Sequence, residues 1–144
     1  MAVALMNERT GVSVADAVEL ADTRASRRRG LLGRDCLEPS ACLILAPCVA
    51  VHTAFMRFAI DVVFVDRAGH ALKIVSELPP WRIAWSPSAH AVVELAGGRL
   101  RSCEVAVGDR LYLAPPSGLS TASPSTSPIG FAERMPTVAE KPNS

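Results

Sequence analysis

Apolar and polar residues alternate with a period of two over most of the first 114 residues, which is the pattern that β-strands produce. In residues 58–65 the large side chains fall on one face, and the other face is also largely apolar. Such a segment predicts a strand that is covered on both sides. The turn residues Asp66–Gly69 follow, and residues 71–76 return as the second strand of a predicted hairpin.

Shorter segments with the same period predict the rest of the fold. Residues 12–14 follow a turn-like Asn7–Gly11 and indicate an opening hairpin. Further strands are expected at 91–95, 105–107 and 111–113. One helix is predicted, Ala25–Leu32, with Thr23 or Ser26 as its N-cap. Many short strands and one short helix predict a mainly β fold, a single antiparallel barrel-like or sandwich domain.

The composition changes at Pro115. The last 30 residues hold six of the eleven prolines, interspersed with serine and threonine, and carry almost no periodic apolar pattern. Such a segment cannot bury enough apolar surface to offset the entropy of ordering it. The expected organisation is a β-rich domain over residues 1–114 and a Pro/Ser/Thr-rich disordered tail over residues 115–144.

Length, charge and cysteine usage narrow the classes of function. A chain of 144 residues with 49% hydrophobic residues is long enough for one domain with its own core. A formal net charge of +1 gives no overall field for nucleic acid or an anionic membrane. The apolar start is too short for a signal peptide, and no apolar run reaches the length of a membrane span. We therefore expect a cytoplasmic protein with four free thiols, Cys36, Cys42, Cys48 and Cys103.

Five short motifs occur in an order that resembles a known family. They are Arg28–Arg34, His52–Asp66 with Gly69, Pro79–Arg82, Glu94–Gly98, and Gly108–Asp109. Together they resemble domain-of-unknown-function family 192, an uncharacterised protein family, over roughly residues 11–113. The resemblance implies a compact β-barrel-like or sandwich domain, and it carries over no catalytic residue.

One segment departs from the family pattern. Many relatives carry Trp-Met-x-Asn-Thr before the shared aspartate, whereas this chain has His52-Thr53-Ala54-Phe55-Met56 before Asp61. Where the Asn-Thr pair contributes to a ligand site in relatives, the corresponding site here has different chemistry. The polar groups left nearby are His52, Thr53 and Arg57.

Cys42, Cys48 and His52 are the candidate metal ligands, because thiolate and imidazole suit zinc or copper. Five residues separate the two cysteines, which is wide for a structural zinc site, and no second cysteine pair follows. Buried free cysteine is the favoured interpretation, so no metal and no cofactor are expected.

A Cys48 nucleophile with His52 as base and Asp61 as the orienting group is the enzyme interpretation. In one extended strand Cys48 and His52 would lie about 13 Å apart, too far for a hydrogen bond. Only a bend after Pro47 would bring them together.

Asp61 lies within an otherwise apolar strand, so its carboxylate must be hydrogen-bonded, paired or solvated at a pocket mouth. We favour a structural pair with Arg57 or Arg82. The functional alternative is a polar–aromatic ligand cleft. Its candidate ligand-binding residues are His52, Thr53, Arg57, Asp61, Trp81 and Arg82.

Five arginines concentrate positive charge between Arg24 and Arg34. They could hold phosphate, RNA or an acidic protein, but they could equally pair with the neighbouring Glu19, Asp22, Asp35 and Glu38. Stacking aromatic residues are not interleaved with them, so no nucleic-acid partner is expected, and no membrane partner either.

The sequence favours a noncatalytic module that binds a small ligand or a peptide in a polar–aromatic cleft between residues 52–61 and 79–87. The alternative is a metal- or thiol-dependent enzyme centred on Cys48, His52 and Asp61. Convergence of those three side chains in the fold would favour the enzyme.

Overall fold

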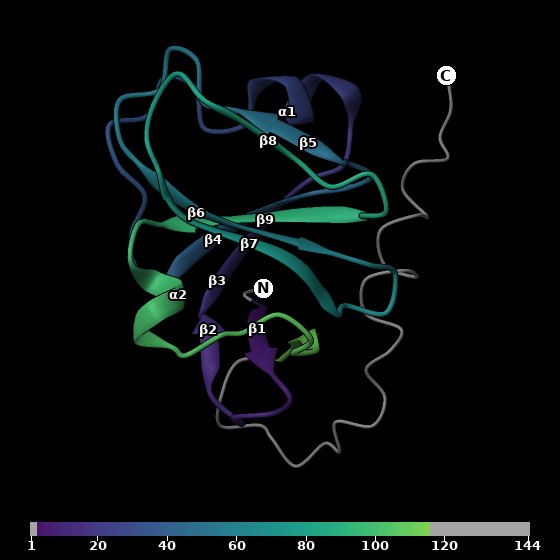
Figure 1. Ribbon diagram of the computed structural model, residues 1–144. Coiled ribbons are helices and arrows are strands. Elements are labelled where there is room, and N and C mark those ends of the chain that lie inside the picture. Colours follow the sequence, from purple (N-terminus) through teal and green to yellow (C-terminus); the bar gives the residue numbers. More distant parts are fainter. Residues whose placement is uncertain (1–2, 116–144) are drawn as a thin grey trace.

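The computed structural model describes residues 3–115 and arranges them in three layers (Figure 1). A five-stranded sheet in the order β3-β4-β9-β6-β7 lies in the middle. A three-stranded sheet in the order β10-β1-β2 packs on one face, and the helix α1 with the two-stranded sheet β5-β8 covers the other. The described fold is therefore mainly β, as the sequence predicts, but its sheets do not close into a barrel.

The twelve described elements are short. They are β1 (Ala4–Asn7), β2 (Ser13–Ala15), β3 (Ala17–Ala21), α1 (Arg24–Arg29), β4 (Ala41–Leu45), β5 (Ala50–His52), β6 (Ile60–Val65), β7 (Ala71–Leu78), β8 (Ile83–Trp85), β9 (Ala91–Ala96), α2 (Arg99–Ser102) and β10 (Leu111–Ala114).

Side chains alternate between the two faces of the central strands and pack into two separate cores. On β6 and β9, Val63 and Val93 face the three-stranded sheet, where they pack with Leu5 and Leu111. The neighbouring residues face the opposite layer. All six residues of β6 are buried, which confirms the expected strand covered on both sides.

The predicted hairpins are confirmed: β1 pairs antiparallel with β2, and β6 pairs antiparallel with β7. Two expectations are wrong. Residues 105–107 form no strand, because the backbone turns there, and the fold is not wholly antiparallel, because β3 and β4 run parallel. The predicted helix is α1, which begins after Thr23 and is shorter than expected. A second short helix, α2, follows β9 and was not predicted.

The proposed tail from Pro115 onward lies almost wholly outside the described residues, so the division of the chain at residue 114 stays a prediction. Among residues 3–115 the two helices have six and four residues, and neither has the length or apolar character to cross a membrane.

Asp61, near the start of β6, connects three segments of the chain. Its carboxylate accepts hydrogen bonds from the backbone N–H groups of Glu77 at 2.7 Å, Gly98 at 3.0 Å and Leu100 at 2.8 Å. The side chain is completely buried. Three donors satisfy a carboxylate that would otherwise be costly to bury. The expected pairing of Asp61 with Arg57 or Arg82 is wrong, because backbone amides bind the carboxylate instead.

We predict that Asp61→Ala lowers the free energy of unfolding by about 4 kcal/mol, because three buried amides lose a charged acceptor. Asp61→Asn should cost about half as much, since its carbonyl oxygen still accepts. Urea unfolding measures both. Asp35→Ala is the control, because that carboxylate side chain is 83% exposed. Equal stability of Asp61→Ala and the wild type would contradict the structural role.

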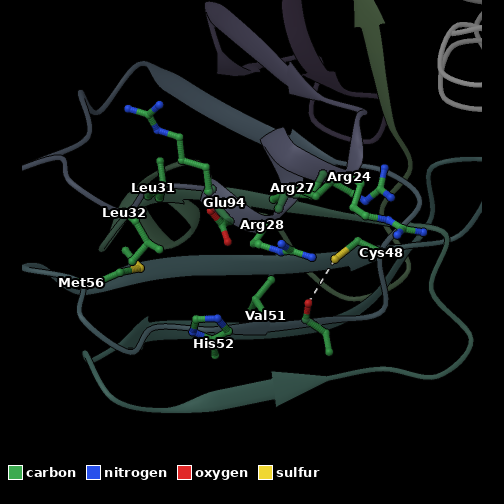
Figure 2. A pocket seen from close by; sticks show the side chains of 14 residues that line it. Arg24, Arg27, Arg28, Leu31, Leu32, Cys48, Val51, His52, Met56 and Glu94 are labelled. Carbon is green, nitrogen blue, oxygen red and sulfur yellow. Dashed lines mark hydrogen bonds between the residues drawn. The ribbon is translucent and has the colours of Figure 1, made fainter. Parts of the chain in front are cut away.

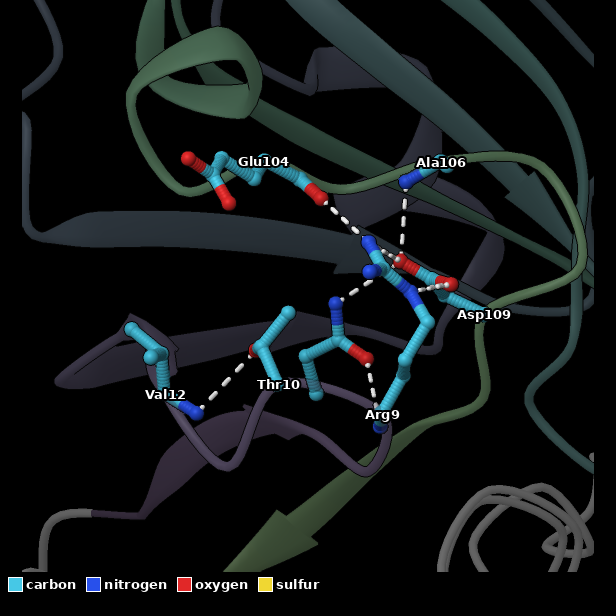
Figure 3. A network of polar contacts seen from close by, with 7 residues as sticks. Arg9, Thr10, Val12, Glu104, Ala106 and Asp109 are labelled. Carbon is cyan, nitrogen blue, oxygen red and sulfur yellow. Dashed lines mark hydrogen bonds and ion pairs between the residues drawn. The ribbon is translucent and has the colours of Figure 1, made fainter.

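A second carboxylate, Asp109, joins the β1–β2 turn to the loop before β10 (Figure 3). Arg9 donates to both of its oxygens, from Nε at 2.6 Å and from Nη2 at 3.1 Å. The Asn7 side chain and the Ala106 backbone donate at 2.9 and 2.8 Å. The Arg9 bond, with support from the Ala106 and Asn7 bonds, lowers the pKa of Asp109 from 3.8 to about 2.

Because the folded pKa of Asp109 lies below the unfolded value, its stabilisation is present above about pH 4 and is lost as the pH falls toward 2. We predict a loss of about 1–2 kcal/mol across that window, discounted because the Arg9 side chain is 54% exposed. Urea unfolding at pH 2, 3, 4 and 5 measures it. Asp109→Asn should be less stable at pH 5 and should show a flatter profile below pH 4. If the stability of the wild type and that of Asp109→Asn fell in parallel between pH 5 and pH 2, Asp109 would not be the source of the pH dependence.

Candidate functional site

The candidate site is a cavity of about 300 Å³ between α1 and β5, with the central sheet as its floor (Figure 2). This volume lies at the lower end of the range for small-molecule sites. Apolar walls come from Leu31, Leu32, Leu45, Val51 and Met56. Its polar groups are Arg24, Arg27, Arg28, Arg29, Cys48, His52 and Glu94.

The arginines lie on the short helix α1, whose first turn is capped by side chains. Thr23 and Ser26 form a reciprocal capping box, each side chain accepting from the backbone N–H of the other residue. Arg27 donates to the backbone oxygens of Asp22 at 3.0 Å and Ala46 at 3.4 Å, which holds the helix against the end of β4. Among residues 3–115 none of the four α1 arginines forms an ion pair.

The opposite wall is β5, paired with β8 at the surface of the molecule. Val51 points inward and is buried, whereas its neighbours Ala50 and His52 are exposed. His52 therefore lies at the rim of the cavity and not in its depth (Figure 2).

Glu94 provides the acidic group of the cavity. It lies in the central strand β9, opposite Leu43 of β4 and Val62 of β6, both of which are buried in the same apolar cluster. The pleat therefore places a carboxylate on the same face as two apolar cross-strand neighbours. Glu94 is only 4% exposed, and its Oε1 atom has no hydrogen-bond partner among the described residues. Figure 2 shows this carboxylate pointing into the cavity, between Arg28 and Leu32.

Burial raises the pKa of Glu94 from 4.5 to about 7, and the charge of Arg34 offsets only part of that rise. Near neutral pH the carboxyl group therefore exists in both protonation states. As a carboxylate it accepts hydrogen bonds from a bound molecule, and as an acid it donates one.

Cys48 lies at the arginine end of the cavity and donates its thiol hydrogen bond to the Ala50 oxygen at 3.1 Å (Figure 2). Burial raises the pKa of the Cys48 thiol and raises that of Cys42, in the core, to about 12. Both thiols are thus protonated near neutral pH, which is unfavourable for a nucleophile or a metal ligand. Within residues 3–115 no three His, Cys, Asp or Glu side chains come together as a metal site.

The family model of DUF192, described as uncharacterized ACR, matches residues 5–113. The chain belongs to this family. A comparison with curated proteins gives no match.

Two solved structures resemble this DUF192 chain. One, from Sinorhizobium meliloti 1021 and named a "putative transcription regulator", is 25% identical with a TM-score of 0.67; the match covers 81% of this chain and 93% of that one. The other is a protein of unknown function from Novosphingobium aromaticivorans DSM 12444. It is 22% identical with a TM-score of 0.64, and the match covers 76% of this chain and 81% of that one. The second likeness shows the fold alone.

The structure of this DUF192 chain separates the predicted cleft residues. His52 reaches the cavity, but Asp61 is enclosed by backbone amides and Arg57 pairs at the surface with Asp35. Thr53 is fully buried: its hydroxyl donates to the Pro79 oxygen at 2.7 Å and accepts from the Arg82 N–H at 2.8 Å. These contacts fasten the 52–56 segment to the 79–82 loop.

Trp81 and Arg82 lie outside the cavity lining, on the exposed surface next to β8. Trp81 is 60% exposed and packs against Phe55, with ring centroids 4.6 Å apart and the ring planes tilted by 60°. Both aromatic residues have left-handed backbones, with φ of 67° and 65°. The Arg82 side chain donates to the Trp81 oxygen at 3.2 Å. The residues predicted to share one cleft therefore divide between the cavity rim, the core and this exposed surface.

Sequence reasoning missed Glu94 and assigned the α1 arginines no role in a pocket. The signal for Glu94 was present, since it interrupts the apolar run Ala91–Ala96 just as Asp61 interrupts its own strand. Only the fold shows that one carboxylate is satisfied by backbone and the other is not.

We predict that Glu94 makes stability fall as pH rises. Its pKa is about 7 in the folded protein and 4.5 when exposed, so its favourable contribution is complete below pH 4.5 and is lost as pH rises through 7. The shift corresponds to about 3 kcal/mol. Urea unfolding between pH 4.5 and 8 should show this decline in the wild type but not in Glu94→Gln. Glu38→Gln, at an exposed position, is the control; a decline that persists in Glu94→Gln would exclude Glu94 as its source.

Proposed function

We propose that this protein is a noncatalytic module that binds a small ligand in the cavity between α1 and β5. The observation that carries the proposal is the buried Glu94 oxygen without a partner, which points into that cavity. An unsatisfied buried polar group costs free energy, so a partner supplied by a bound molecule stabilises the complex. Arginines at the rim and apolar walls complete a composition that is typical of small-molecule sites.

The contacts of the other candidate residues favour binding over catalysis. A thiol-dependent enzyme needs an activated Cys48 thiolate and an orienting carboxylate. Burial raises the pKa of Cys48, and the Asp61 carboxylate is occupied by three backbone amides. The four cysteines are free thiols, which agrees with the cytoplasmic location that we propose.

The test is a set of nuclear magnetic resonance titrations of the full chain with benzoate, benzylamine and toluene, three probes of similar size and different charge. We predict that at least one shifts the backbone amide signals of Leu32, Val51 and Glu94. Leu32→Trp narrows the cavity and should remove those shifts, because its larger ring occupies the space. Trp81→Ala, on the neighbouring exposed surface, should keep them.

Two results would overturn the proposal. One is that no probe shifts the signals of the cavity residues at millimolar concentration. The other is that the shifts survive in Leu32→Trp but disappear in Trp81→Ala, which would place binding on the aromatic surface.

A further inference from the structure

The cavity is lined by two kinds of polar group on different parts of the fold, and each kind binds a different chemical group of a ligand. Arg24 and Arg28 belong to α1, are exposed, and carry positive charge that no ion pair among residues 3–115 offsets. Glu94 belongs to the sheet that forms the floor, and it is buried. Leu32 and Met56 lie on one side of the carboxylate and Val51 lies beneath it, while Arg28 lies on the other side (Figure 2).

Resting on the proposed function, we propose that the ligand is a small organic acid that carries a hydrogen-bond-donating group at the far end of an apolar body. The acid group meets Arg24 and Arg28, and the donor group, an ammonium or a hydroxyl, meets the Glu94 oxygen that lacks a partner.

Each end of this ligand is inferred from a separate observation. Guanidinium groups bind carboxylates and phosphates with charge-assisted hydrogen bonds, and α1 offers several of them with no acidic partner in the described chain. The Glu94 carboxylate needs a donor, because nothing within residues 3–115 supplies one to Oε1. Leu31, Leu32 and Val51 would pack on the middle of the ligand.

The purely apolar and purely anionic alternatives fit less well. An apolar molecule would cover Glu94 and leave its oxygen unsatisfied, which a buried acceptor tolerates poorly. A simple anion would gain from the arginines but would place negative charge in the same cavity as Glu94. A molecule with both groups satisfies Glu94 and the arginines together.

The test uses four benzene derivatives of nearly equal size, titrated calorimetrically into the full chain. They are 4-(aminomethyl)benzoate, 4-(hydroxymethyl)benzoate, 4-ethylbenzoate and 4-ethylbenzylamine. The first two carry an acid and a donor, the third lacks the donor, and the fourth lacks the acid. We expect 4-(aminomethyl)benzoate to bind about 10-fold more tightly than 4-ethylbenzoate, the value expected for one buried hydrogen bond to a charged group. Comparison with the hydroxymethyl compound shows whether the donor must be cationic.

Two sets of variants assign the two ends. In Glu94→Leu, and less completely in Glu94→Gln, the preference for 4-(aminomethyl)benzoate over 4-ethylbenzoate should disappear. In Arg28→Gln the three benzoates should bind more weakly while 4-ethylbenzylamine is unchanged. Arg101→Gln, an exposed arginine on α2 that does not line the cavity, is the matched control.

The outcomes separate this inference from the proposed function. If 4-ethylbenzoate binds in the cavity as tightly as both donor-bearing acids, the ligand class is wrong and the binding function stands. If the donor preference survives in both Glu94 variants, Glu94 is not the acceptor and the inference fails. If none of the four compounds binds in the cavity while benzoate, benzylamine or toluene does, the ligand class is wrong and the binding function stands; if those three probes also fail, the proposed function fails together with the inference.

Discussion

The hydrogen bonds to the Asp61 carboxylate hold the parts of the chain on which the rest of the structure depends. They connect the start of β6 to the end of β7, to the turn after β9 and to the start of α2. Since β9 pairs with both β4 and β6, these bonds anchor the chain that leaves a central strand of the sheet. Both cores are built on that sheet, so the anchored end belongs to the layer that the two cores share.

The same register gives Glu94 its different role. Asp61 is opposite Leu95, whereas Glu94 is opposite Val62, so the two carboxylates occupy adjacent positions of paired strands and face opposite sides of the sheet. Asp61 lies where the turn after β9 and the start of α2 supply donors. Glu94 faces the layer of α1 and β5, where side chains leave a cavity and no donor reaches Oε1. The same carboxylate group therefore stabilises the fold in one place and leaves an acceptor without a partner among the described residues in the other.

Local patterns predicted much of the fold and little of the candidate site. Period-two alternation identified the β6–β7 hairpin and β9, and the N-cap preference of threonine marked the start of α1. The parallel pairing of β3 with β4 depends on contacts across more than 20 residues, which no local pattern contains. The partners of Asp61 were missed because backbone amides carry no sequence signature. The cavity was missed because α1 and Glu94 are about 65 positions apart in the chain.

The way in which the surface arginines are paired explains why positive charge remains at the cavity. Arg34 pairs with Glu19, and Arg57 pairs with Asp35, so two of the acidic residues near α1 are engaged with arginines outside the helix. Arg27 is directed to backbone oxygens and anchors the helix. Arg24 and Arg28 keep their charge unpaired within the described chain while Glu94 lies buried below them. The arginines lie on α1 and the carboxylate lies on β9, so the charges of the cavity belong to different elements, and this favours a ligand that carries two polar groups.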